Sequence, residues 1–162
     1  MTMRFSYKSV KANPESSASG IHVELEMKSE LAAVLPVVVE LMVVISKSDC
    51  VPGQERDVEV ALREALENAV LHGNRVDPAK QVHISCRCEL GKEVAITVRD
   101  EGQGFDSTAV LYPMVPGNIK SHHERGIPLM RLLMDEVHFE QGGREVHMRK
   151  RSSPRKGNSF QP

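Results

Sequence analysis

The chain has 162 residues, of which 40% are hydrophobic and 27% are charged, and its formal net charge is -1. This composition is typical of one globular domain with an apolar core, and it excludes a largely disordered chain. The small net charge gives no reason to expect a nucleic-acid partner or an anionic membrane surface.

Both ends of the chain are polar, and no apolar run has the length that a signal peptide or a membrane span requires. We therefore expect a cytoplasmic protein without membrane contact. Residues 1–19 are predicted to be a flexible N-terminal segment, residues 20–150 a single domain, and residues 151–162 a basic, disordered tail.

The first predicted elements are a strand and an apolar helix. Residues 20–28, GIHVELEMK, alternate with the period of a half-buried strand. Residues 29–48 predict a buried helix with Ser29 as its N-cap and a kink or a start near Pro36. Its segment VVVELMVVI offers more apolar surface than one sheet face needs. This surface has two interpretations: part of the helix lines a dimer interface, or the whole helix is buried within its own domain.

A second helix and a hairpin follow. From residue 55 to residue 72, apolar side chains recur at helical spacing, and Gly73 is expected to end the helix in the left-handed conformation. The alternating segments QVHISCRCEL and KEVAITVRD predict a β-hairpin through Gly91. Cys86 and Cys88 have no partner pair at metal-site spacing, so we interpret them as strand residues and predict no disulfide framework.

The last third of the chain begins with a glycine-bearing loop and a long irregular stretch, residues 112–125, which is expected to be a mobile lid. A helix opening at Gly126 comes next, and then a strand, a Gly142-Gly143 turn and another strand. This order of elements predicts an α/β sandwich: one largely antiparallel sheet with helices on one face.

Glu64 and Asn68 lie one turn apart on the flank of the second helix's apolar stripe, where they should face a partly closed space. The simplest interpretation is a hydrogen bond between the two side chains along the helix. The other is a functional carboxylate and carboxamide.

Asp100 follows a predicted strand and precedes Gly102 and Gly104. This pattern fits a turn, but a carboxylate there can also accept a hydrogen bond from an exocyclic amine such as that of adenine. It is not the dinucleotide-binding fingerprint, because Ser107 stands where a third glycine is needed. Gly126, at its expected helix start, fits a phosphate site, although an ordinary helix start explains it on its own.

Three motifs together resemble the N box and the two glycine boxes of the GHKL ATPase superfamily: Glu64-x-x-x-Asn68, Asp100-x-Gly102-x-Gly104 and Gly126 before a helix. The resemblance covers residues 21–150. Within the superfamily, the segments EALENAVLHGN and RGIPLMRLLMDEV are most similar to anti-sigma factor serine/threonine kinases of the RsbW type. Sensor histidine kinases usually carry a second asparagine where this chain has His72.

The resemblance implies a Bergerat-type fold, a two-layer α/β sandwich with a mixed, mostly antiparallel sheet, and a site for ATP and Mg²⁺. Asn68 would bind Mg²⁺, Asp100 would recognise adenine, and Glu64 would be the general base. The remaining implied site residues surround the nucleotide or meet its phosphates: His72, Gly102, Gly104, Arg125 and Gly126.

The implied activity is that of an ATP-dependent protein serine/threonine kinase that binds a sigma factor and phosphorylates an antagonist protein of the STAS type. The alternative is a switch module that binds ATP and its partners without phosphoryl transfer, and a third interpretation is a nucleotide-free adaptor. Three features depart from the family: Glu124 at the lid-side glycine pair, Pro128, and Arg144-Glu145 where a threonine often lies near the adenine. They predict fewer phosphate contacts and weaker nucleotide binding.

Overall fold

The structure is a computed structural model that describes residues 8–10, 20–105 and 122–154. These residues form a six-stranded sheet of strand order β1-β2-β3-β4-β6-β5, antiparallel in every described pair. The strands are β1 (Lys8–Val10), β2 (Gly20–Lys28), β3 (Gln81–Glu89), β4 (Glu93–Arg99), β5 (Glu136–Glu140) and β6 (Glu145–Arg151). The predicted α/β sandwich is confirmed, and β1 is a strand that the sequence pattern did not predict.

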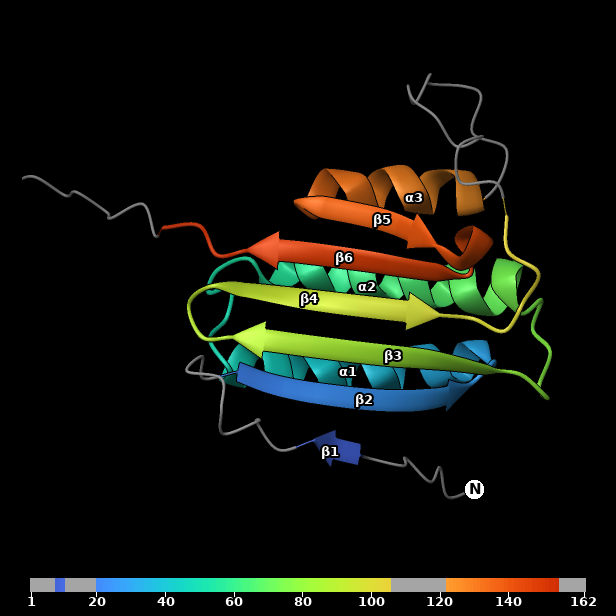
Figure 1. Ribbon diagram of the computed structural model, residues 1–162, viewed down its shortest axis with the longest axis horizontal. Helices are drawn as coiled ribbons and strands as arrows, with labels where there is room; N and C mark the ends of the chain where they lie inside the picture. The colour runs from blue at the N-terminus through green and yellow to red at the C-terminus, as the bar shows by residue number, and fades with distance from the viewer. Residues whose placement is uncertain (1–7, 11–19, 106–121, 155–162) are drawn as a thin grey trace, which may run out of the picture.

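The helices are α1 (Leu31–Lys47), α2 (Glu55–Asn68) and α3 (His122–Leu133). Figure 1 shows α1 behind β2 and β3 and α2 behind β4 and β6, with α3 beside β5. Alternate residues of the strands point to this side and are buried, as in β3 and β4, where the alternation had predicted a hairpin. No helix within the described ranges is both long and apolar enough to cross a membrane.

Helix α1 begins one residue later than predicted. Its N-cap is Glu30, whereas Ser29 is buried and donates its backbone N–H to the Lys80 carbonyl at 3.2 Å. Pro36 lies inside the helix rather than at its start. One face of α1 is fully buried against the sheet and α2, but Leu35 and Val39 on the opposite face are both 56% exposed. The interpretation that the whole helix is buried in its own domain is therefore wrong.

Helix α2 continues into a wider turn, the π-helical segment Ala69–Gly73. The backbone N–H of Asn74 donates to the Ala69 carbonyl at 2.8 Å, five residues back, which is the π-type bond. The prediction of a left-handed Gly73 is wrong, because the positive φ angles fall at Arg75 (55°) and Val76 (56°). The glycine is needed for a different reason, described below.

Helix α3 starts before the predicted position. It includes His122, so Gly126 lies within the helix and not at its N-terminus. Its C-terminal end is held by Lys150, a buried lysine whose Nζ donates to the Leu133 carbonyl at 2.7 Å and lies 3.3 Å from an Asp57 carboxylate oxygen. The predicted lid falls largely in 106–121, and both predicted flexible ends fall largely in 1–7, 11–19 and 155–162, all outside the described residues.

Candidate nucleotide site

A cavity of about 60 Å³ lies where the C-terminal end of α2 and the π turn meet the end of β4, α3 and the β5–β6 turn. Apolar side chains such as Val98, Ile127 and Met130 form much of its wall. The polar or glycine residues at its surface include four predicted site residues, Asn68, His72, Asp100 and Gly104. Segments far apart in the sequence therefore converge on one pocket.

Asn68 is the most unusual polar group of this cavity. Both of its amide atoms, Oδ1 and Nδ2, are buried, and neither has a hydrogen-bond partner among the described residues. The proposed hydrogen bond between Glu64 and Asn68 along the helix is therefore absent. Leaving a buried amide unpaired costs about 1–3 kcal/mol, so native proteins rarely keep one without a ligand or a water to satisfy it.

Gly126 on α3 packs against this pair. A Cβ placed on Gly126 would stand 2.9 Å from Asn68 Nδ2 and 2.9 Å from Glu64 Oε2. The glycine thus lets α3 approach α2 closely enough to cover both side chains. The prediction that Gly126 opens a helix is wrong, because its backbone lies within α3.

Asp100 is held between two glycine backbones at the other end of the cavity. A Cβ on Gly73 would overlap the Asp100 carboxylate, and a Cβ on Gly102 would overlap the Gly73 carbonyl. The Gly102 N–H donates to Asp100 Oδ1 at 2.8 Å. The glycines here serve close approach, which explains why Gly73 is needed without a left-handed backbone.

The charge of Asp100 is also tuned by its position. Burial raises the pKa of the Asp100 carboxyl above its ordinary value, and the hydrogen bond from the Gly102 N–H offsets part of this effect. Oδ2 accepts no hydrogen bond from the described residues.

Asn74 fixes the position of this carboxylate. It is fully buried, its Nδ2 donates to the Gln81 carbonyl at 2.9 Å, and its Oδ1 accepts the Glu101 N–H at 2.8 Å. One side chain therefore joins the end of the π turn to the start of β3 and to the loop after β4. The Asp100 N–H donates in turn to the Arg144 carbonyl at 2.9 Å, which adds the start of β6.

The β5–β6 turn closes the remaining side. The Phe105 N–H donates to the Gly142 carbonyl at 2.8 Å, and the rings of Phe105 and Phe139 meet edge to face with centroids 5.3 Å apart. Gly104, at φ 80°, passes directly beside that carbonyl, where a Cβ would overlap it. Arg144 lines the cavity, whereas Glu145 points to the opposite face of the sheet.

The structure thus brings most of the predicted site residues together. Glu64, Asn68 and Gly126 meet at one end, and Asp100 with Gly102 and Gly104 at the other. The side chain of Arg125 lies outside the described residues. The sequence reasoning assigned no site role to three residues that line the cavity: Phe105, Met130 and Phe139. Of these, Phe105 directly follows the Asp100-x-Gly102-x-Gly104 motif, and Met130 lies within the segment RGIPLMRLLMDEV.

This fold and this pocket, with a carboxylate between glycines at one end and a buried asparagine at the other, define a nucleotide-site architecture. The chain belongs to the histidine kinase-like ATPase domain family, which matches residues 27–150. It is similar to the anti-sigma F factor of Geobacillus stearothermophilus, at 32% identity over 124 residues, covering 74% of this chain and 82% of the relative.

Two further anti-sigma F factors give similar results. That of Oceanobacillus iheyensis is 28% identical over 119 residues, covering 69% of this chain and 80% of the relative. That of Anoxybacillus flavithermus is 33% identical over 87 residues, covering 51% of this chain and 58% of the relative. These similarities confirm the resemblance to GHKL ATPases that the three motifs had indicated.

The contact between Gly73 and Asp100 can be tested by a double-mutant cycle. Gly73→Ala should lower the free energy of unfolding by about 1–3 kcal/mol, because its methyl group overlaps the carboxylate. In an Asp100→Ala background the same change should cost at least about 1 kcal/mol less, since the overlapping atoms are gone. Urea unfolding of the four proteins measures both values. Equal costs in the two backgrounds would show that the glycine is required for another reason.

Proposed function

We propose that the chain is an ATP-dependent anti-sigma factor that acts as a protein serine/threonine kinase, with residues 20–150 as its ATP-binding kinase domain. The observation that carries the proposal is the buried, unpaired amide of Asn68 beside Glu64, in a cavity whose other end holds Asp100. Family membership and the anti-sigma F factors among its relatives support the same activity.

Asp100 suits the recognition of adenine. Its Oδ1 is occupied by the Gly102 N–H, so Oδ2 presents an acceptor to the exocyclic amine of the base. Apolar walls at Val98, Ile127 and Met130 suit the flat ring. A volume of about 60 Å³ is far below the several hundred Å³ of an ordinary ligand pocket, so the pocket would widen to admit a whole nucleotide.

Asn68 suits a magnesium ion that accompanies the phosphates. An amide oxygen is a hard ligand of the kind Mg²⁺ accepts, and the Asn68 amide has no competing partner among the described residues. When bound, Mg²⁺ would neutralise charge on the transferred phosphoryl group. Gly126 keeps the space beside the amide free of a side chain.

Glu64 lies next to Asn68 at the same helix surface and is the candidate general base. Its carboxylate would accept the proton of the attacking serine or threonine hydroxyl as the oxygen bonds to phosphorus. His72, Gly102 and Gly104 would shape the pocket around the nucleotide, and Arg125 with Gly126 would face the phosphates.

The names of the relatives support a sigma factor as a protein partner. We propose that the chain binds a sigma factor and phosphorylates a STAS-type antagonist, which would place it in the cytoplasm with the transcription machinery. A second copy of the chain is a further proposed partner. Helix α1 exposes an apolar stripe at a spacing of four residues, consisting of Leu31, Leu35, Val39 and Val43.

Metal binding and proton abstraction should be separable at Asn68 and Glu64. Asn68→Ala should remove much of the Mg²⁺-dependent ATP affinity, because it deletes the metal ligand. Glu64→Gln should keep the fold and most of the affinity while slowing phosphoryl transfer about 10²–10⁴-fold. Calorimetry with ATP and Mg²⁺ measures the ATP affinity. Formation of phosphoserine or phosphothreonine on the STAS proteins of the same genome measures the rate of phosphoryl transfer.

Glu67→Gln is the matched control for both measurements, because it changes the next carboxylate of the same helix. If Glu64→Gln transfers phosphate at the parent rate, the chain has another base. ATP binding without transfer by the parent protein would favour the switch module, and no ATP binding would favour the adaptor.

Asp100→Asn should weaken the preference for adenine. If the amide oxygen of the new asparagine accepts the hydrogen bond from the Gly102 N–H, the amide NH₂ group stands in place of Oδ2. The NH₂ group and the adenine amine are both donors, so the hydrogen bond to the base is lost. The ratio of ATP to GTP affinity should fall about 10–100-fold, the equivalent of about 1–3 kcal/mol. Competition calorimetry measures this ratio, and an unchanged ratio would remove Asp100 from base recognition.

The raised pKa of Asp100 adds a pH dependence to this recognition. Protonation turns the acceptor into a donor, so ATP affinity should decrease as the pH falls through the folded-state pKa of Asp100. This loss should begin above the roughly 3.9 of an ordinary aspartate. It should be absent from Asp100→Asn.

The proposed dimer is tested by Leu35→Glu, which puts a charge into the exposed stripe of α1. Sedimentation analysis should show the parent as a dimer and the variant as a folded monomer with a lower thermal stability, because the dimer stabilises the folded chain. Leu132→Glu on α3 is the matched control, since Leu132 is also exposed, at 76%, but lies on another helix. A monomeric parent protein would contradict the proposal.

A further inference from the structure

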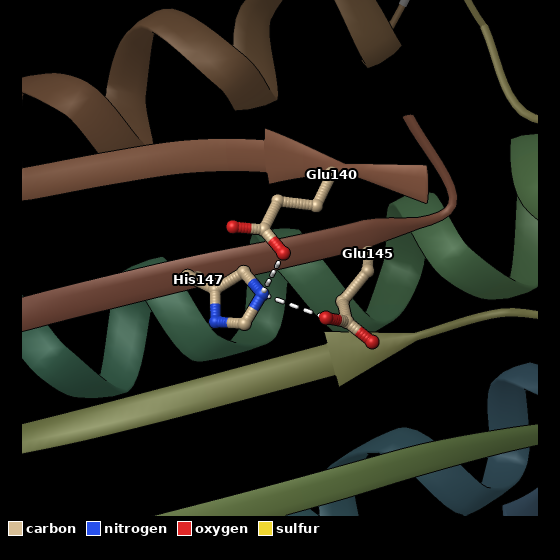
Figure 2. Close-up of side chains that lie close together, drawn as sticks. All are labelled: Glu140, Glu145 and His147. Atoms are coloured by element: carbon tan, nitrogen blue, oxygen red, sulfur yellow. Dashed lines mark hydrogen bonds and ion pairs between the residues drawn. The ribbon is translucent and has the colours of Figure 1, made fainter. Parts of the chain in front are cut away.

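The sheet face opposite the helices is lined with polar side chains, and one group of them has the composition of a metal site. Glu140 ends β5, Glu145 begins β6, and His147 lies two residues further along β6 (Figure 2). Glu140 and Glu145 are opposite each other in the antiparallel register, and Glu145 and His147 share one face of their strand. One ligand atom from each residue lies within 4.8 Å of the others.

Both glutamates approach the same ring nitrogen of His147. Nε2 lies 2.7 Å from Glu145 Oε1 and 3.4 Å from Glu140 Oε2, as the dashed lines in Figure 2 show. The other ring nitrogen, Nδ1, lies 3.1 Å from the hydroxyl oxygen of Thr97. If Nδ1–H donates to that hydroxyl, the lone pair of Nε2 points at the two carboxylates. Metal-binding histidines are commonly fixed in this way by a partner on the second nitrogen.

The surroundings orient the carboxylates as well. Gln141 Nε2 donates to Glu145 Oε2 at 3.1 Å, which leaves Oε1 turned toward His147. Like charges directly opposite each other on neighbouring strands repel, and this applies to Glu140 and Glu145. Arg99 of β4 is the cross-strand partner of Glu145 on its other side and offsets part of this repulsion. A doubly charged ion with a neutral imidazole would balance both carboxylates.

We propose that Glu140, Glu145 and His147 bind a divalent transition-metal ion of the zinc class, separate from the nucleotide cavity. Zinc accepts histidine nitrogen and carboxylate oxygen together, and three protein ligands leave one position for water. The 3.4 Å between Nε2 and Glu140 Oε2 is close to the separation of two ligands about 2.0–2.1 Å from a tetrahedral ion. The 2.7 Å between Nε2 and Glu145 Oε1 is shorter, so the Glu145 side chain would move by about 0.6 Å to admit the ion. The histidine disfavours Mg²⁺ and Ca²⁺, which prefer oxygen ligands.

His83 on the same sheet face provides a matched contrast. It also has two glutamates at its ring, but Glu26 is 3.2 Å from Nδ1 and Glu101 is 3.2 Å from Nε2. The two carboxylates therefore lie at different nitrogens, and one ion cannot be bound by all three groups. His83→Gln is therefore a control: it removes a histidine that also has two glutamate neighbours, but whose neighbours do not meet at one ring nitrogen.

The experiment is calorimetric titration of the full chain, freed of metal with a chelator, with Zn²⁺ in the presence of excess Mg²⁺. We expect one Zn²⁺ per chain. His147→Gln and Glu140→Gln should each weaken its binding at least tenfold, and Thr97→Val should weaken it about 10–100-fold by releasing the ring. His83→Gln should bind like the parent. Thermal unfolding with and without Zn²⁺ should show stabilisation of the parent and of His83→Gln only.

Two results would overturn the proposal: a parent protein that binds no Zn²⁺ under these conditions, or variants at His147 and Glu140 that bind it as the parent does. Glu140 is exposed, so Glu140→Gln keeps the test valid if His147→Gln does not fold.

Discussion

The buried amide of Asn74 is the interaction on which the site depends. Its two hydrogen bonds tie the π turn after α2 to the first residue of β3 and to the peptide that follows Asp100. Gln81 lies seven residues after Asn74, and Glu101 lies 27 residues after it. A second link joins the last two of these segments, because Glu101 Oε2 accepts the Gln81 N–H at 2.9 Å. The amide is buried, so its bonds compete little with water, and loss of either partner would leave a polar group unsatisfied. The carboxylate of Asp100 is positioned through this link and through the glycines on either side of it.

Patterns with a strong period were sufficient to predict most of the fold. The alternation in β2, β3 and β4 gave the correct strands and the hairpin, because one face of each strand packs on helices and the other does not. The apolar stripe of α2 predicted its buried face for the same reason. β1 was missed because three residues are too few to display a period. Its position follows from pairing with β2, which is tertiary information.

The sequence predicted which residues form the site more successfully than it predicted the local backbone structure around them. Asn68, His72, Asp100 and Gly104 do line one cavity, yet the reasons given for two glycines were wrong. Gly73 and Gly126 were expected to serve backbone conformation or a helix end, whereas each provides space for a side chain from a distant segment. No local pattern reports such a contact. Similarly, the choice between a paired and an unpaired Asn68 depended on the rotamers of two neighbouring residues, which the spacing alone leaves open.

The π turn at Ala69–Gly73 places an unusual restriction on the length of the chain. A π turn is equivalent to an α-helix that has accepted one extra residue. Removal of any one of its residues would restore ordinary helical bonding and a locally more regular helix. It would also change the direction in which the residues after the deletion leave the helix. Gly73 would leave the Asp100 carboxylate, and Asn74 would lose both of its partners. Insertions and deletions should therefore be excluded from these five residues over evolution, even where single substitutions are accepted.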